Sequence, residues 1–318
     1  MRDGKFVSAD RLSMPRRFAS PFLLTAALGF LIPPAALAEV TVERSESGVT
    51  VKLDGQPFAE YLVQSGGKPI VWPIIGPTGK PLTRAYPMGE GADESHDHPH
   101  HRSLWFTHGK VSGVDFWLEG DDKGQIKHRE FVKVQGGESA TIITHDDWLG
   151  PDGKKVCEDE RKLVFGGDSD ARFIDVEITV AASEGPVTFG ETKEGSFGVR
   201  TATTMRPDKG KGGQIVNSEG QTDKAAWGQQ AAWVDYHGPV DGERVGIAIF
   251  NHPGSFRFPT HWHVRTYGLF AANPFMRAGH AIESGKTLTL RYRVFLHRGD
   301  EKEGKVAEAY ERYANSAE

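Results

Sequence analysis

Histidines are concentrated in one short stretch of this chain. The segment "ESHDHPHHRSLWFTHGK", residues 94–110, holds five of the thirteen histidines, namely His96, His98, His100, His101 and His108. Imidazole titrates near neutral pH, transfers protons and binds transition metals, so a cluster of this kind can do chemistry. Pro99 cannot donate a ladder hydrogen bond, which predicts an edge strand or a loop here rather than a central strand.

Alternation along an extended chain would divide this cluster between two sides. His96, His98 and His100 would point one way, and Asp97 and His101 would point the other way. On a loop, in contrast, the imidazoles can converge on one point.

A second histidine pair lies far along the chain in "PTHWHVRTYG". His261 and His263 are two residues apart, so on a strand both side chains point to the same face. His252 in "FNHPG" follows the apolar segment "VGIAIF" shortly before this pair. We expect the three histidine-bearing segments to meet in one site.

Three interpretations of these histidines are open. In the first they bind a divalent transition metal, with His98, His100, His261 and His263 as candidate ligands. In the second they perform metal-free acid–base chemistry, with His100, His101, His261 and His263 as candidate catalytic groups. In the third they form a hydrogen-bonded structural network beneath loops. The chain has neither an HExxH motif nor a paired CxxC motif, so the sequence itself assigns no cofactor.

Charged residues near the histidines can complete an acid–base site. The segment "TFGETKEGSFGVR" places Lys193 beside Glu194, whose carboxylate is the candidate general base. Lys193, Arg102 beside the first cluster and Arg265 beside the second pair are candidates to bind an anionic group or a vicinal diol. The alternative for each is a structural ion pair.

Aromatic side chains accompany the same segments. Trp227, Trp262 and Tyr267 are the candidate rings for stacking against a sugar, because polar residues flank them. His252 is added to them as a candidate substrate-binding residue. The other aromatics are predicted to belong to the core, since large rings dominate the packing of β-sandwiches.

The elements that must position these residues are mainly strands. Between residues 173 and 180 apolar Ile and Val alternate with other residues, which predicts a strand with one face on a core. Similar segments recur along the chain between glycine-rich turns, and we see no interior linker. We therefore predict an all-β protein, one large antiparallel β-sandwich over residues 39–318. Only the end has a helical period, with Val306, Tyr310 and Tyr313, which predicts a short C-terminal helix from about residue 300.

The first 38 residues resemble a signal peptide rather than part of the fold. Arg16 and Arg17 precede an apolar run over residues 22–32, and a small-residue cleavage site ends at Ala38. Met14 is the expected true start. The apolar run is shorter than the roughly 20 residues that a spanning helix needs. We expect a periplasmic or secreted protein without a membrane span.

Net charge limits the partners. The chain has 38 Lys and Arg and 43 Asp and Glu, a formal charge of −5. Without residues 1–38, which hold five of the former and two of the latter, the balance is 33 minus 41, or −8. This acidic balance argues against nucleic acid or an anionic membrane surface as partner. No segment indicates a protein partner, and the single Cys157 allows no intramolecular disulfide.

Three motifs carry a family resemblance over nearly the whole chain after residue 38. "DHPHHRSLWFTHGKVSGVDFW", "ETKEGSFGVR" and "FPTHWHVRTYGLFAANPF" resemble a bacterial family catalogued as PmoA, or methane oxygenase. The membrane methane monooxygenase subunit of that name is an integral membrane protein, whereas this sequence has no spanning segment. The resemblance therefore implies an exported domain of unassigned function, and it transfers no catalytic residues.

The last strand carries a second resemblance. "AGHAIESGKTLTLRYRVFLHRG" is similar to the closing turn and strand of galactose-mutarotase-like supersandwich proteins. This resemblance implies a fold class that includes sugar epimerases, lyases and hydrolase domains, commonly with a histidine acid and a carboxylate base in an open groove of the sheet. Fold analogy alone does not establish function.

These observations together favour an exported carbohydrate-active enzyme. We expect acid–base chemistry on a small-molecule or oligosaccharide substrate, by epimerisation, elimination or hydrolysis, with a His/Glu/Arg site. Two alternatives remain, a non-catalytic sugar-binding protein and a metalloprotein that uses the histidines as ligands.

Overall fold

Two antiparallel sheets of eight strands each dominate the computed structural model, which describes residues 1, 38–91, 93–210 and 212–316. In spatial order, the first sheet consists of β1 (Val40–Arg44), β2 (Gly48–Leu53), β3 (Gln56–Ser65), β4 (Lys68–Ile74), β5 (Leu104–His108), β11 (Gly195–Arg200), β16 (Leu269–Asn273) and β15 (His261–Arg265). The second consists of β12 (Gln214–Asn217), β13 (Trp233–Val240), β14 (Glu243–Asn251), β18 (Thr287–Arg298), β9 (Ala171–Ala181), β8 (Lys155–Gly167), β7 (Ala140–Leu149) and β6 (Gln125–Gln135). The predicted large antiparallel sandwich is confirmed.

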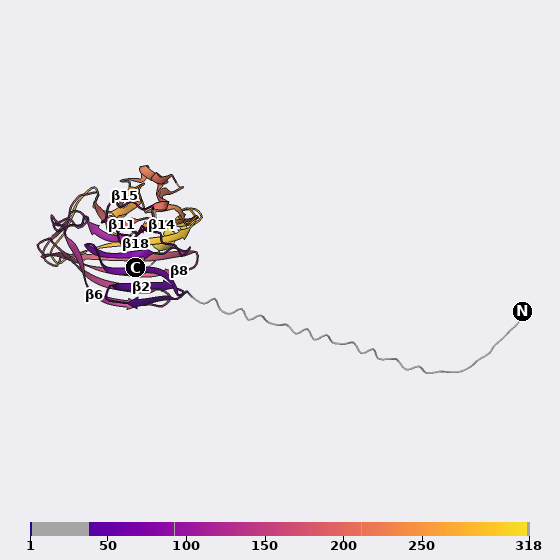
Figure 1. Ribbon diagram of the computed structural model, residues 1–318, viewed down its shortest axis with the longest axis horizontal. Coiled ribbons are helices and arrows are strands. Elements are labelled where there is room, and N and C mark those ends of the chain that lie inside the picture. The colour runs from indigo at the N-terminus through magenta and orange to yellow at the C-terminus, as the bar shows by residue number, and fades with distance from the viewer. Residues whose placement is uncertain (2–37, 92, 211, 317–318) are drawn as a thin grey trace, which may run out of the picture. The chain divides into compact units, whose positions relative to one another are not determined.

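Smaller elements complete the fold. A two-stranded sheet pairs β10 (Val187–Phe189) with β17 (His280–Ile282). Three short 3₁₀ turns, η1 (Thr203–Met205), η2 (Pro207–Lys209) and η3 (Asp223–Ala226), lie in the connections around β12. In the view of Figure 1, β15 lies on the opposite side of the sandwich from β2 and β6. This agrees with the position of β15 as the last strand of the first sheet.

The core lies between the two sheets and follows from strand periodicity. Along β9, buried and half-buried residues alternate without a break, and Ile174, Val176 and Ile178 are on the buried face. Their neighbours on β18 alternate in the same phase, so that Tyr292 pairs with Val176 and Leu290 with Ile178. A one-residue slip would turn this whole row outward, so burial fixes the register.

The single α-helix of the described residues, α1 (Val306–Ala314), confirms the predicted C-terminal helix. Tyr310 and Tyr313 pack against Phe250 of β14, on the face of the second sheet that points away from the main core. The helix begins at Val306 rather than near residue 300. The intervening residues form turns in which the Asp300 carboxylate accepts hydrogen bonds from backbone N–H groups of residues 302 and 303.

Two expectations concern other parts of the chain. The predicted signal peptide, with its start at Met14 and its apolar run, falls outside the described residues. No helix among the described residues has the length and apolar character needed to cross a membrane.

A buried carboxylate and two histidines lie beneath the turns that lead to α1. Asp235 is fully buried and accepts hydrogen bonds from His237 Nδ1 at 2.6 Å and from His297 Nε2 at 2.8 Å. The other ring nitrogen of His297 lies 3.0 Å from the carbonyl oxygen of Arg298. Both nitrogens of His297 therefore face acceptors, which requires the imidazolium form. Burial lowers the pKa of His297, but Asp235 outweighs burial and raises it above the ordinary value.

This pair makes stability depend on pH in a defined direction. A histidine whose pKa rises on folding contributes fully below its unfolded pKa of about 6.5, and this contribution is lost as pH rises through the folded pKa. We expect His297→Gln to lower the free energy of unfolding by roughly 3 kcal/mol at pH 5.5, and by less at pH 9. Urea unfolding of both proteins across this range measures the difference. The exposed His96→Gln is the control, and a difference that is constant or grows with pH would contradict the assignment.

Candidate functional site

Three of the predicted histidine and carboxylate segments meet around one cavity of about 230 Å³. It opens at the end of the first sheet, between the loop before β5, the loop after β5, the loop before β11, and β15 with its turn to β16. The predicted site residues that line it are His98, His100, His101, Lys193, Glu194, His263, Arg265 and Tyr267. The structure therefore brings His98, His100, His101, Glu194 and His263 to one cavity, whereas the histidine segment at His252 does not reach it.

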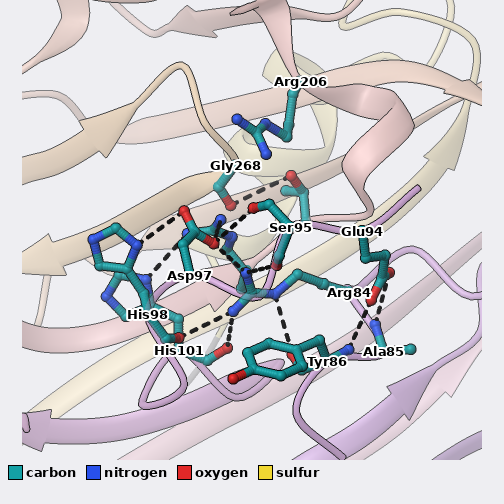
Figure 2. A network of polar contacts seen from close by, with 12 residues as sticks. Arg84, Ala85, Tyr86, Glu94, Ser95, Asp97, His98, His101, Arg206 and Gly268 are labelled. Carbon is teal, nitrogen blue, oxygen red and sulfur yellow. Dashed lines mark hydrogen bonds and ion pairs between the residues drawn. The ribbon is translucent and has the colours of Figure 1, made fainter. Parts of the chain in front are cut away.

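One carboxylate holds the histidine loop to the sheet. Asp97 Oδ1 accepts hydrogen bonds from Arg84 Nη1 at 2.6 Å and from Arg200 Nη2 at 2.8 Å, and Asp97 Oδ2 lies 3.0 Å from His98 Nδ1. Figure 2 shows Asp97 and Arg84 at the centre of this network. Arg84 and Arg200 are almost fully buried, with 1% and 0% of the residue exposed. Burial would raise the pKa of Asp97, but Arg200 and the hydrogen bonds from Ser95, His98 and Arg84 hold it well below its usual range.

The same arginine shapes the loop backbone. Arg84 Nη2 donates to the carbonyl oxygen of His98 at 3.0 Å, and Arg84 Nε donates to that of Tyr86 at 3.1 Å. His98 has a positive φ of 47°, and the N–H of His101 donates to the His98 carbonyl, which closes a turn. The segment is thus a loop, one of the two arrangements that Pro99 predicts, and the strand-like alternation does not occur. The turn brings His98, His100 and His101 to one cavity, while His96 stacks on Tyr86 outside it.

Stacked rings fill the space between the loop and the sheet. His98 stacks on Tyr267 with a centroid distance of 5.2 Å and on His101 at 4.8 Å. His101 in turn stacks on Trp105 of β5 at 5.4 Å, and Trp117 meets His101 edge-on at 5.5 Å. Flat rings packed in this way have few alternative rotamers, so the imidazoles are held in fixed orientations.

The hydrogen bond from Arg200 determines the tautomer of His101. Arg200 Nη1 lies 3.2 Å from His101 Nδ1, and a guanidinium can only donate. His101 Nδ1 therefore accepts, and in the neutral ring the proton is on Nε2. Burial lowers the pKa of His101 far below its ordinary value, and the charges of His100 and Arg200 lower it further. His101 is thus a neutral donor at pH 7.

The tautomer of His263, on another wall of the cavity, also follows from a hydrogen bond with an arginine. Arg265 Nε donates to His263 Nε2 at 3.3 Å, so the proton of the neutral ring is on Nδ1. This Nδ1 is buried and makes no hydrogen bond of normal geometry among the described residues, although the Lys193 backbone is close enough to raise the pKa of the ring. It lies 4.0 Å from Glu194 Oε2. Burial, with Arg265 and Lys193, lowers the pKa of His263 to about 3. An N–H donor and a carboxylate thus face each other across a gap too long for a hydrogen bond.

The third neutral ring is His100. Burial lowers its pKa to about 4, with a further contribution from the charge of Lys68. Lys68 is 1% exposed and bonds Glu119 Oε1 at 2.8 Å. Arg102 binds both oxygens of the same Glu119 at 2.8 Å. Arg102 was predicted to bind substrate, and that prediction is corrected here, because its guanidinium is used in this ion pair behind the cavity.

Four other predicted site residues lie elsewhere. His261 lines a separate cavity, although it shares β15 with His263. Trp262 is fully buried and its Nε1 donates to the carbonyl of residue 231, so it belongs to the core. His252 is buried near α1, where Tyr313 meets it edge-on at 5.1 Å. Trp227 lies outside the cavity lining and contacts Arg265.

The predicted metal set does not assemble. His261 lies in another cavity, and His98 and His100 pack ring against ring with a centroid distance of 5.7 Å. In the described part of the chain, the group of histidine and carboxylate atoms that lie within 4.8 Å of one another is instead Asp235, His237 and Glu301 beneath α1. The His98, His100, His261 and His263 interpretation is therefore corrected.

Sequence reasoning missed several residues of the site. Asp97 and Arg84, which set the loop, lie 13 residues apart with no motif that connects them. Asp115 also lines the cavity, and its Oδ1 accepts from the backbone N–H groups of Trp117 and Leu118. The only available signal for Asp97 was its place inside the histidine cluster.

The low pKa values of the buried histidines can be measured directly. In the folded protein the ring of His100 should titrate near pH 4 and that of His263 near pH 3, since burial disfavours the charged form. In urea both rings should titrate near pH ~6.5. Unfolding then takes up protons, so these rings make the protein less stable as pH falls below about 6.5. Ring ¹⁵N shifts recorded against pH provide the test, and titration near neutrality in the native state would contradict it.

Removal of the Asp97 charge should loosen the site and the fold together. Asp97→Asn leaves two buried guanidinium groups without a counter-charge, and we expect a loss of about 2–4 kcal/mol in the free energy of unfolding. The lower end allows for solvent screening, because 36% of the Asp97 side chain is exposed. Urea unfolding at pH 7 measures the loss, and Asp121→Asn on the surface is the matched control. Equal stability of the two variants would show that Asp97 is dispensable.

Comparison with solved structures gives only distant likenesses. An α-galactosidase of glycoside hydrolase family 36 from Geobacillus stearothermophilus is 10% identical, with a TM-score of 0.43, over 83% of this chain and 42% of that chain. A putative aldose 1-epimerase from Escherichia coli K12 is 10% identical, with a TM-score of 0.32, over 82% and 100% of the two chains. A galactose mutarotase-like protein from Clostridium acetobutylicum is 8% identical, with a TM-score of 0.37, over 82% and 98%.

These likenesses carry no argument about this chain at such TM-scores, and the chain spans less than half the length of the α-galactosidase. No curated protein matches the chain in sequence. None of the comparisons carries the PmoA label, which remains a resemblance of sequence motifs. The model of a family of unknown function, DUF6807, matches residues 48–311, and the protein therefore belongs to that family.

Proposed function

We propose that the cavity binds a small hydroxylated ring, and that Glu194 and His263 act on one of its hydroxyl or C–H groups by proton transfer. The observation that carries this proposal is the buried His263 Nδ1, which makes no hydrogen bond of normal geometry among the described residues and lies 4.0 Å from Glu194 Oε2. A buried donor without an acceptor costs free energy, so its persistence indicates a ligand atom.

The 4.0 Å gap between His263 Nδ1 and Glu194 Oε2 limits which kind of ligand atom can bond to both groups. An oxygen at about 2.8 Å from both groups can accept from His263 and donate to Glu194. A hydroxyl group does both at once, whereas a carboxylate or phosphate oxygen cannot donate. The neutral rings of His100 and His101 extend this pattern. His100 has one donor and one acceptor at pH 7, and His101 adds the Nε2–H donor, because its Nδ1 already accepts from Arg200.

The size and walls of the cavity suit one sugar ring. Its volume of about 230 Å³ is below the roughly 300–1,000 Å³ of sites for drug-sized ligands. Tyr267 and Trp117 provide aromatic surface on its lining. Aromatic surface beside convergent polar groups is the arrangement that binds the mixed apolar and polar faces of a sugar.

The roles of the two reacting groups follow from their surroundings. Lys193 Nζ lies 3.3 Å from Glu194 Oε1, so an ammonium group accompanies the carboxylate that is proposed as the base. His263 is neutral at pH 7, so it serves as a fixed N–H donor to negative charge that develops on the substrate. Epimerisation or elimination needs one base and one donor. Hydrolysis usually needs two carboxylates, and the second on this lining, Asp115, is bonded to its own turn.

The proposal includes export. The charged, apolar and small-residue order of residues 14–38 supports secretion to the periplasm or beyond, where oligosaccharides are available as substrates.

A screen of neutral and acidic oligosaccharides in D₂O tests the function. Proton transfer at a sugar carbon should incorporate deuterium, detected by mass spectrometry, and elimination should also produce an unsaturated sugar. Glu194→Gln should reduce the rate about 10²–10⁴-fold, because it removes the base, and His263→Gln should reduce kcat more than it raises KM. The exposed Glu191→Gln is the matched control and should keep full activity.

Other outcomes have defined meanings. Sugar binding without turnover, weakened by Glu194→Gln, would show a non-catalytic binding protein and would contradict the proposed chemistry. Equal activity of Glu194→Gln and Glu191→Gln would remove Glu194 from the mechanism.

A further inference from the structure

A second cavity, of about 210 Å³, lies next to the candidate site along the same strand. It is lined by His261, Arg257, Arg277, Gln230 and Phe258, with backbone from residues 274 and 278. His261 and His263 are two residues apart on β15, so their Cα atoms are about 7 Å apart and their side chains project to the same face. The two cavities are therefore neighbours at about the spacing of one sugar unit.

Positive charge in this second cavity is not balanced. No Asp or Glu is on its lining, and no carboxylate of the described residues forms an ion pair with Arg257 or Arg277. The Arg257 guanidinium is held in place by the carbonyl oxygens of residues 274, 278 and 279. Burial lowers the pKa of His261, and the charges of Arg277 and Arg257 lower it further. Arg257, held by these carbonyls, and the exposed Arg277 have no carboxylate partner among the described residues, so this cavity can attract an anion.

Trp227 connects the two cavities. The guanidinium of Arg265, which lines the first cavity, lies 5.1 Å from the centre of the Trp227 ring. The guanidinium of Arg277, which lines the second, lies 5.7 Å from the same centre. Trp227 is thus packed between a residue of each cavity, and its buried Nε1 has no partner among the described residues.

We propose that the cavity around His261 and Arg277 is a second subsite, which binds an anionic group on the sugar unit next to the one that reacts. This proposal rests on the proposed function of the first cavity. The substrate class is then an acidic oligosaccharide that carries a carboxylate or a sulfate. Arg277 provides the charge and His261 the hydrogen bond, while Phe258, 37% exposed, lies at the rim.

Inorganic sulfate tests the anion site without any assumption about a sugar. At constant ionic strength set by chloride, sulfate should shift the ring resonances of His261 saturably. Arg277→Gln should weaken this binding roughly tenfold, as expected for the loss of a charge-assisted hydrogen bond, and Arg277→Lys should restore part of it. Lys224→Gln removes an exposed charge outside the lining and should change nothing. No saturable shift, or equal shifts in the wild type and Arg277→Gln, would overturn the site.

Disaccharides test the connection between the cavities. By calorimetry, digalacturonate or a sulfated disaccharide should bind roughly tenfold more tightly than neutral galactobiose, and Arg277→Gln should abolish the difference. The relative affinities of the carboxylated and sulfated probes identify which anion is preferred. Galactobiose binding should depend on Glu194 and not on Arg277.

Failure of either proposal gives a different result. If neutral and acidic disaccharides bind equally while sulfate still shifts His261, the anion site is separate from the substrate site and the subsite proposal is overturned, with the function of the first cavity intact. If sulfate binds but no sugar binds or reacts, the proposed function fails and the subsite proposal fails with it.

Discussion

The candidate site depends on the bond of Asp97 to two buried arginines. A guanidinium group cannot lose its proton in a protein, so Arg84 and Arg200 need a counter-charge wherever they are buried. Asp97 supplies it with a single oxygen, at 2.6 and 2.8 Å. Arg84 lies in the segment after β4, and its N–H donates to the carbonyl of Arg200 at the end of β11. This carboxylate therefore joins the histidine loop to two segments that are bonded to each other.

The arginines that Asp97 holds also affect the protonation state of the histidines that line the cavity. Arg200 donates to His101, and the net positive charge close to the rings lowers the pKa of the imidazoles together with burial. Three histidines in one cavity are therefore neutral near pH 7, and they act as donors and acceptors rather than as cations. Negative charge at the surface of the cavity comes mainly from Glu194 and Asp115. An arrangement of this kind recognises hydroxyl groups and leaves proton abstraction to Glu194.

The local sequence pattern predicted the elements that interactions between residues close in the chain determine. Alternation gave the strands of the sandwich, the helical period gave α1, and the density of His and charged residues pointed to His98, His100, His101, Glu194 and His263. The pattern failed where contacts between distant parts of the chain determine the conformation. The positive φ at His98, which forms the turn that brings the histidines together, has no signal in the local pattern, and Arg102 forms an ion pair with Glu119 instead of lining the cavity. His261 and His263 share a face of β15, but different loops cover them, so they line different cavities.

The two cavities differ in charge, and this difference suits the role that is proposed for each. Next to the reacting atoms, a fixed cation would hold an anionic group of the substrate as strongly before the reaction as during it, and such uniform binding gives no acceleration. One sugar unit away, the same attraction adds affinity without affecting the proton transfer, and its energy can hold the reacting ring between Glu194 and His263. In the first cavity the charge of Lys193 is matched by Glu194, and the imidazoles of His100 and His263 are neutral. The second cavity has no carboxylate on its lining, so its arginines can attract an anion. In the chain this difference arises between two histidines on one strand, His263 beside Glu194 and His261 beside Arg277.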